Sequence, residues 1–92
     1  MKAELADYIL KLQRAREETR RAEDRTLYER YLAEAGVLLA LVETEADADT
    51  IRAAMAAHER LWSNSWLQDD VYRVPGEAWE TLKRMMAGQP GA

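Results

Sequence analysis

The chain has 92 residues, a formal net charge of −4 and no cysteine. This length suits a single domain, and the lack of cysteine excludes disulfides, thiolate metal sites and cysteine nucleophiles. Hydrophobic residues make up 48% and charged residues 33%, as in folded soluble domains. No apolar run approaches the roughly 20 residues that span a membrane. We therefore expect a folded cytoplasmic protein that does not bind membranes.

The charge is unevenly distributed along the chain. Residues 1–42 carry eight acidic and eight basic residues, whereas residues 43–80 carry nine acidic and only three basic ones. Nucleic-acid binding requires a basic face, so the acidic second half argues against a nucleic-acid partner. An acidic surface attracts a basic one, which favours another protein with a basic surface as the partner.

The first half of the chain predicts two helices that form an antiparallel hairpin. The first is expected over 3–23, and its apolar stripe loses phase near 24–26. Thr26 and Glu29 form an S/T-x-x-E capping box, which predicts that the second helix spans 27–43. The apolar positions are Leu5, Tyr8, Ile9, Leu12 and Ala15 in the first helix, and Tyr28, Tyr31, Leu32, Ala35, Leu38, Leu39 and Val42 in the second.

Two shorter helices are predicted in the second half. Asp47 is a good N-cap for a third helix over 48–63. Pro75 suits the first position of a fourth helix over 75–87, and residues 88–92 are expected to form a flexible tail. The inward positions are Ile51, Met55, His58, Leu61 and Trp62 in the third helix, and Trp79, Leu82 and Met86 in the fourth.

These elements predict an all-α fold, a small antiparallel bundle of four helices in a single domain over 1–87. The long hairpin of the first two helices would be its scaffold. The stretch 37–42 is apolar nearly all round the second helix. Three short neighbours would not cover it easily, which makes a homodimer an expected assembly.

The sequence contains no recognisable catalytic or metal-binding constellation. "HERLW" at 58–62 begins like the zinc motif H-E-x-x-H, but Trp62 stands in the place of the second histidine. His58 is the only histidine, and no serine lies in a nucleophile-elbow sequence. We therefore expect a non-catalytic protein without a metal or another cofactor.

Two acidic pairs leave a second interpretation open. Glu4 with Asp7, and Glu77 with Glu80, each place two carboxylates on one helical face. Pointing inward together, they would hold Mg²⁺ and support a magnesium-dependent hydrolase. The favoured interpretation is that these acids lie in solvent near helix N-termini, where they interact well with the helix dipole.

All three tryptophans fall within residues 60–79. We expect two rings in the core and one at the rim beside acidic residues, because an exposed aromatic rimmed by charge is typical of a binding hot spot. The expected function is a small acidic protein-binding module, a regulator, inhibitor or immunity-type partner that uses residues 59–80. An aromatic pocket for a small apolar ligand between the third and fourth helices is a further alternative. The predicted partner-binding residues are His58, Trp62, Trp66, Asp69, Asp70 and Tyr72.

Overall fold

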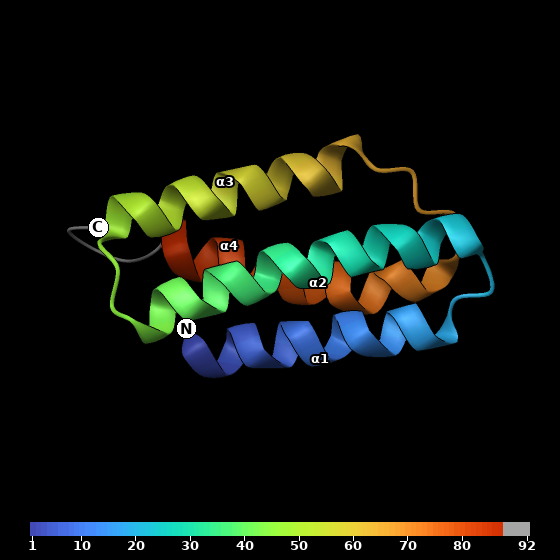
Figure 1. Cartoon of the computed structure of the whole chain (residues 1–92), viewed down its shortest axis with the longest axis horizontal. Coiled ribbons are helices and arrows are strands. Elements are labelled where there is room, and N and C mark those ends of the chain that lie inside the picture. The colour runs from blue at the N-terminus through green and yellow to red at the C-terminus, as the bar shows by residue number, and fades with distance from the viewer. Residues whose placement is uncertain (88–92) are drawn as a thin grey trace.

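The computed structural model describes residues 1–87 and contains four α-helices (Figure 1). No strand occurs within this range, so the predicted all-α fold class is confirmed. The predicted flexible tail, 88–92, lies outside the described residues. The elements are α1 (Lys2–Glu18), α2 (Ala22–Glu43), α3 (Ala48–Asn64), the 3₁₀ turn η1 (Asp70–Tyr72) and α4 (Arg73–Ala87).

Successive helices run in opposite directions along the long axis of the molecule. In Figure 1, α2 returns alongside α1, α3 runs along the other edge of α2, and α4 lies behind them. The bundle measures 42 × 21 × 20 Å, a shape set by the length of its helices. None of the helices in the described range combines the length and hydropathy that a membrane span requires.

The apolar stripes predicted from helical spacing turn toward one shared core. Each buried leucine or aromatic ring contributes roughly 1.5–3 kcal/mol to folding by leaving water. Half-buried members of the predicted stripes, such as Leu32, Leu39, Ile51 and Met86, pack at the edge of this core. The buried apolar residues are Leu5, Tyr8, Leu12, Ala15, Tyr28, Tyr31, Ala35, Leu38, Met55, Leu61, Trp79 and Leu82.

The bend between the first two helices lies five residues earlier than predicted. α1 ends at Glu18 and α2 begins at Ala22, so the predicted break at 24–26 is wrong. Thr26, expected as an N-cap, lies inside α2 and donates its hydroxyl to the carbonyl oxygen of Ala22 at 3.1 Å. The hairpin itself is present, but a local capping box does not start its second helix.

Two aspartates far apart in the sequence hold the bend where it is. The Asp24 side chain is 1% exposed, and its Oδ2 accepts hydrogen bonds from the backbone N–H groups of Gln68 (3.1 Å) and Asp69 (2.9 Å). In return, Oδ2 of Asp69 accepts from the Thr19 hydroxyl (3.1 Å) and the Arg20 N–H (3.0 Å). We call this reciprocal arrangement the aspartate clasp. It ties the α1–α2 turn to the α3–η1 loop through residues more than 40 positions apart, so no local capping motif reveals it.

The other helix ends follow local rules more closely. Asp47 caps α3 as predicted, because its side chain accepts from the Thr50 N–H at 2.8 Å. Glu45, in the turn between α2 and α3, has φ 57°, the left-handed region that favours glycine. α4 begins at Arg73, two residues before the predicted start, because η1 leads directly into it; Pro75 is its third residue.

Candidate functional site

Three of the six predicted partner-binding residues lie together at one surface. Trp62, Trp66 and Tyr72 line a shared surface hollow with Ser65 and Leu67. Trp66 is 84% exposed, while Trp62 and Tyr72 are half-buried. Trp66 is thus the tryptophan at the rim that the sequence left unidentified. We call Trp62, Trp66 and Tyr72 the aromatic face.

The other three predicted residues divide between the interior and the surface. His58 is 1% exposed and lies in the core, so it is not available to a partner. The Asp69 carboxylate is occupied within the chain, where it holds the clasp and accepts from the Val71 N–H at 3.4 Å. Hydrogen bonds from the Arg20 backbone and the Thr19 hydroxyl lower the pKa of Asp69. The predicted contacts of His58 and Asp69 are therefore corrected to structural roles, and only Asp70 is an exposed acid of this group.

His58 belongs to a hydrogen-bonded chain that crosses the core. Its Nδ1–H donates to Oε1 of Glu34 at 2.8 Å, and its Nε2 accepts from the Tyr8 hydroxyl at 2.5 Å. The indole N–H of Trp62 donates to the same Tyr8 oxygen at 2.8 Å. Burial lowers the pKa of His58 and outweighs the opposite effect of Glu34, so the ring is neutral at neutral pH.

This chain has the hydroxyl–imidazole–carboxylate order of a catalytic triad, but its position does not suit catalysis. Tyr8 is fully buried, so a substrate has no access to its oxygen. Burial also raises the pKa of Tyr8, which disfavours the phenolate that would act as a nucleophile. The arrangement instead fixes the Trp62 ring from behind, because Trp62 donates to a group that is itself anchored in the core.

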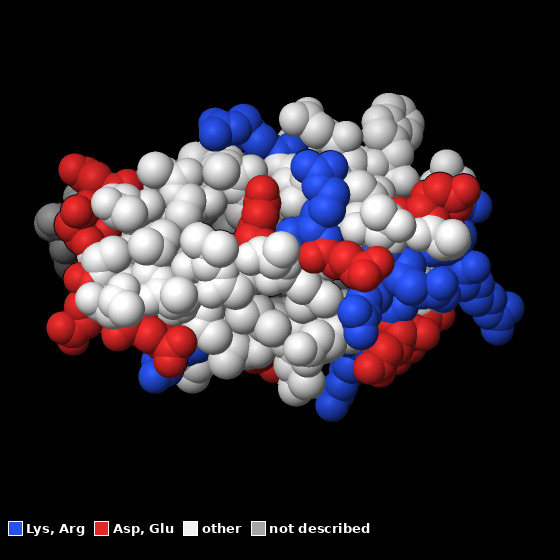
Figure 2. Space-filling view, viewed as in Figure 1, with Lys and Arg blue, Asp and Glu red and all other residues white. Residues whose placement is uncertain are grey.

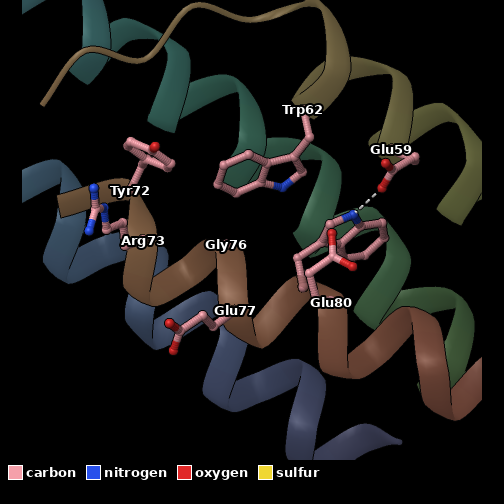
Figure 3. A pocket seen from close by; sticks show the side chains of 8 residues that line it. Glu59, Trp62, Tyr72, Arg73, Gly76, Glu77 and Glu80 are labelled. Atoms are coloured by element: carbon pink, nitrogen blue, oxygen red, sulfur yellow. Dashed lines mark hydrogen bonds between the residues drawn. The ribbon is translucent and has the colours of Figure 1, made fainter. Parts of the chain in front are cut away.

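A second hollow lies between α3 and α4. The backbones of α3 and α4 do not pack closely against each other. The Trp62 and Trp79 rings occupy the space between these two helices. The hollow has a volume of about 330 Å³, and Trp62, Trp79 and Tyr72 line it (Figure 3). Gly76 and four charged residues complete the lining, the charged ones being Glu59, Glu77, Glu80 and Arg73.

Hydrogen bonds hold the deeper side of this hollow. The Trp79 ring is 2% exposed, and its N–H donates to Oε2 of Glu59 at 2.6 Å. Nζ of Lys83 lies 2.9 Å from Oε2 of Glu59 and 2.9 Å from Oε1 of Glu80. Partial burial acts to raise the pKa of Glu59, but the hydrogen bonds from Lys83 and Trp79 outweigh it and lower the pKa. Glu59 is therefore a carboxylate at neutral pH.

The acidic pairs behind the magnesium alternative do not meet. Glu4 and Asp7 line a hollow between α1 and α4, whereas Glu77 and Glu80 line the hollow between α3 and α4. Oε1 of Glu4 lies 3.1 Å from the terminal amine, and Oδ2 of Asp7 lies 2.8 Å from Nζ of Lys11. Within residues 1–87, no group of three or more histidines and acids is placed to hold a metal ion. The convergence on which the hydrolase interpretation depended is therefore not found there.

The charges around Trp66 also differ from the expected acidic fringe. On its α2–α3 side, Trp66 borders a hollow lined by Arg30, Arg60 and Glu34. Figure 2 shows a largely uncharged area over the C-terminal half of α2, with charged groups near the centre and toward both ends of the molecule. Of the acids in the 59–80 region, Glu59, Glu77 and Glu80 border the α3–α4 hollow instead.

Sequence reasoning did not identify Tyr8 and Glu34 as the partners of His58. Tyr8 was assigned to the apolar stripe of the first helix, which is correct but gives no partner for its hydroxyl. Glu34 follows Tyr31 by three residues, so it borders the buried stripe of α2. An acid beside a buried stripe indicates that its carboxylate has a partner within the fold, but nothing in the sequence identifies that partner as His58.

The chain has no significant match among protein-family models, curated proteins or solved structures. Its function is therefore inferred from the aromatic face, the α3–α4 hollow and the buried hydrogen bonds that support them.

Proposed function

We propose that this chain is a non-catalytic protein-binding module, a small regulator or inhibitor that contacts its partner through the aromatic face. The observation that carries the proposal is the 84% exposure of Trp66 beside the half-buried rings of Trp62 and Tyr72. Burying apolar surface is worth roughly 25 cal/mol per Å². Large aromatic residues at the centre of an interface are the usual source of its binding energy.

The support beneath the face makes it suitable for binding. The segment that carries Trp66 is anchored at both ends, because Ser65 donates to the Leu61 carbonyl oxygen at 2.6 Å and Asp24 accepts from Gln68 at 3.1 Å. Trp62 is fixed through Tyr8. A surface already held in position loses less conformational entropy when a partner binds.

The surrounding charges suggest the chemistry of the partner. Arg30 and Arg60 line the hollow on the α2–α3 side of Trp66, and Glu77 and Glu80 line the hollow on the α3–α4 side. Complementary charges on the partner would raise the association rate and set its orientation. We expect a partner that places basic groups against the α3–α4 side and acidic groups against the α2–α3 side.

Photo-crosslinking in the host cell tests this proposal. Benzoylphenylalanine replaces Trp66 in one variant and Leu10 in a control variant. Leu10 is also an exposed apolar residue, at 45%, but it lies on α1, which is not closely packed against α3. We expect a protein adduct from position 66 that position 10 does not give.

The mass of the adduct distinguishes a second copy of the chain from a different protein. An adduct with twice the mass of the chain would make a second copy the partner, and a different mass would reveal another protein. Absence of an adduct at position 66, or the same adduct from both positions, would contradict the aromatic face as the binding surface.

A further inference from the structure

The α3–α4 hollow is shaped by rings on two sides and by a residue without a side chain between them. Figure 3 shows the Tyr72 and Trp62 rings on the same side of α4, next to the segment that contains Gly76. A Cβ added at Gly76 would lie 3.9 Å from Cη2 of Trp62, in ordinary van der Waals contact. A longer side chain there would extend into the space between the rings. Glycine therefore keeps the floor of the hollow open.

The charged lining of the hollow is predominantly acidic. Glu59, Glu77 and Glu80 face a single cation in the lining, Arg73. Glu59 and Glu80 share Lys83, whereas Glu77 makes no ion pair with any residue in the range 1–87. With Arg73 and Lys83 set against these three carboxylates, the surroundings of the hollow keep a net charge of −1, which attracts a cation.

The combination of aromatic rings and carboxylates in the α3–α4 hollow indicates which class of ligand it binds. Aromatic rings attract cations through the negative potential of their faces, and such rings recognise quaternary ammonium groups. A bare metal ion would gain little from rings, and a neutral apolar ligand would gain little from three carboxylates. The volume, about 330 Å³, is near the lower end of small-ligand sites, which span roughly 300–1,000 Å³.

From these observations we infer that the α3–α4 hollow binds an alkylated ammonium group between Trp62 and Tyr72, with the Glu77 and Glu80 carboxylates supplying the counter-charge. The group could belong to a free small molecule or to a methylated lysine side chain of a protein partner. In the second case the inference rests on the proposed function, because Trp62 and Tyr72 belong to both sites. Trp66 does not line this hollow, so the two proposals can be tested separately.

The walls of the hollow are fixed before any ligand arrives. Trp62 donates to Tyr8 in the core, and Trp79 donates to Glu59, which Lys83 also holds. The first contact orients the Trp62 indole by its N–H group and leaves part of its ring surface exposed to a ligand, while the second fixes the buried Trp79 ring. A rigid site of this kind binds without the entropic cost of ordering its side chains.

The first test compares choline with its neutral isostere 3,3-dimethylbutan-1-ol, which has the same shape without the charge. The full chain carries Trp66→Phe, so the remaining fluorescence comes from Trp62 and Trp79, which both line the hollow. We expect saturable binding of choline and at least about tenfold weaker binding of the isostere, because only the cation gains from the ring faces. Equal binding of both would show an apolar pocket, and no saturable change with either would show that the hollow is not a site; each outcome overturns the inference.

Variants locate the binding. Glu77→Gln should weaken choline binding about threefold or more, as loss of a nearby counter-charge predicts. Glu29→Gln, which removes an exposed acid from α2, should have no effect. Gly76→Leu should abolish binding by filling the hollow, and the Glu77 variant keeps the test decisive if Gly76→Leu does not fold. Unchanged affinity in Glu77→Gln would contradict the assignment.

The source of the ammonium group follows from a second titration. A short peptide containing trimethyllysine is compared with the same peptide containing unmodified lysine and with free choline. Tighter binding of the methylated peptide than of choline would identify a partner's side chain, and equal or tighter binding of choline would identify a small molecule. If choline binds but position 66 gives no crosslink, the inferred ligand site in the hollow is supported and only the protein-binding proposal is rejected.

Discussion

At the scale of single residues, His58 joins three helices through its two ring nitrogens. The neutral ring suits its surroundings, because one nitrogen donates to Glu34 and the other accepts from Tyr8. A protonated ring would donate from both nitrogens. It would leave the Tyr8 hydroxyl hydrogen without its acceptor and place a charge in the core.

Acid should therefore destabilise the protein before its carboxylates titrate. Burial lowers the pKa of His58 in the folded state, whereas a histidine in the unfolded chain has a pKa of about 6.5. The unfolded state binds more protons as the pH falls below that value, so the free energy of unfolding decreases, by at most about 1.4 kcal/mol per pH unit. Urea denaturation at pH 7.5 and pH 5.5 measures the difference.

The variant His58→Gln is the control, because it keeps a polar side chain but removes the titration. Its stability should change little between pH 7.5 and pH 5.5, although its overall stability is lower. An equal loss in the variant and the natural chain would assign the effect to other groups.

At the scale of elements, the aspartate clasp connects the two loops at one end of the bundle. Asp24 accepts two backbone N–H groups from the opposite loop, and Asp69 accepts one N–H and the Thr19 hydroxyl. Hydrogen bonds to a buried charge are worth more than neutral ones, because the charge has left water and has no alternative partner. The clasp thereby sets both the bend after α1 and the position of the segment that carries Trp66.

Asp24→Ala should lower the free energy of unfolding by about 2–3 kcal/mol, since the partly buried amides of Gln68 and Asp69 lose their charged acceptor. Hydrogen exchange of those two amides should accelerate more than exchange in the centre of α3. Glu23→Ala, which changes an exposed neighbour, should alter neither quantity. Unchanged protection of both amides in Asp24→Ala would show that the clasp does not order the loop.

The turn between α2 and α3 offers a gain in stability. Glu45 is the one non-glycine residue with positive φ within residues 1–87, and this conformation costs a side chain about 1–2 kcal/mol. Glu45→Gly should recover about 1 kcal/mol, reduced by the greater freedom of glycine in the unfolded chain. Thermal unfolding measures the change. Glu29→Gly, within α2, should instead destabilise by about 1 kcal/mol, and a loss in both variants would argue against strain at Glu45.

At the scale of the whole molecule, one side of α2 is left without a covering helix. Val37 is 61% exposed, and a Cβ at Gly36 would meet nothing within 4 Å. Figure 2 shows a largely uncharged area over this part of the molecule. The homodimer expected from the apolar second helix stays a prediction, and this surface is where we expect the copies to meet.

Sedimentation equilibrium tests that prediction. The natural chain should sediment with twice the mass of one chain, and Val37→Asp should shift it to the monomer, because a charge in an apolar interface is costly. Leu10→Asp, an equal change on α1, should leave the dimer intact. A monomeric natural chain, or a dimer unaffected by Val37→Asp, would reject this assembly.

The sequence by itself determined the helical class and the buried face of each helix. Residues such as Leu5, Tyr28 and Met55 repeat with the period of the helix, and Asp47 caps α3 through a residue three positions away; both signals are local. It also placed the tryptophans near one another, and Trp62, Trp66 and Tyr72 do share a surface.

The tertiary structure decided which of these residues face water and where the first helix ends. Asp24 contacts Gln68, 44 residues away, and His58 contacts Tyr8, 50 residues away. These partners depend on how the helices pack, and the spacing of residues along one helix carries no information about them. For the same reason the sequence placed His58 on the inward face of its helix without its partners Tyr8 and Glu34, and did not assign Asp69 to the clasp or Trp66 to the solvent.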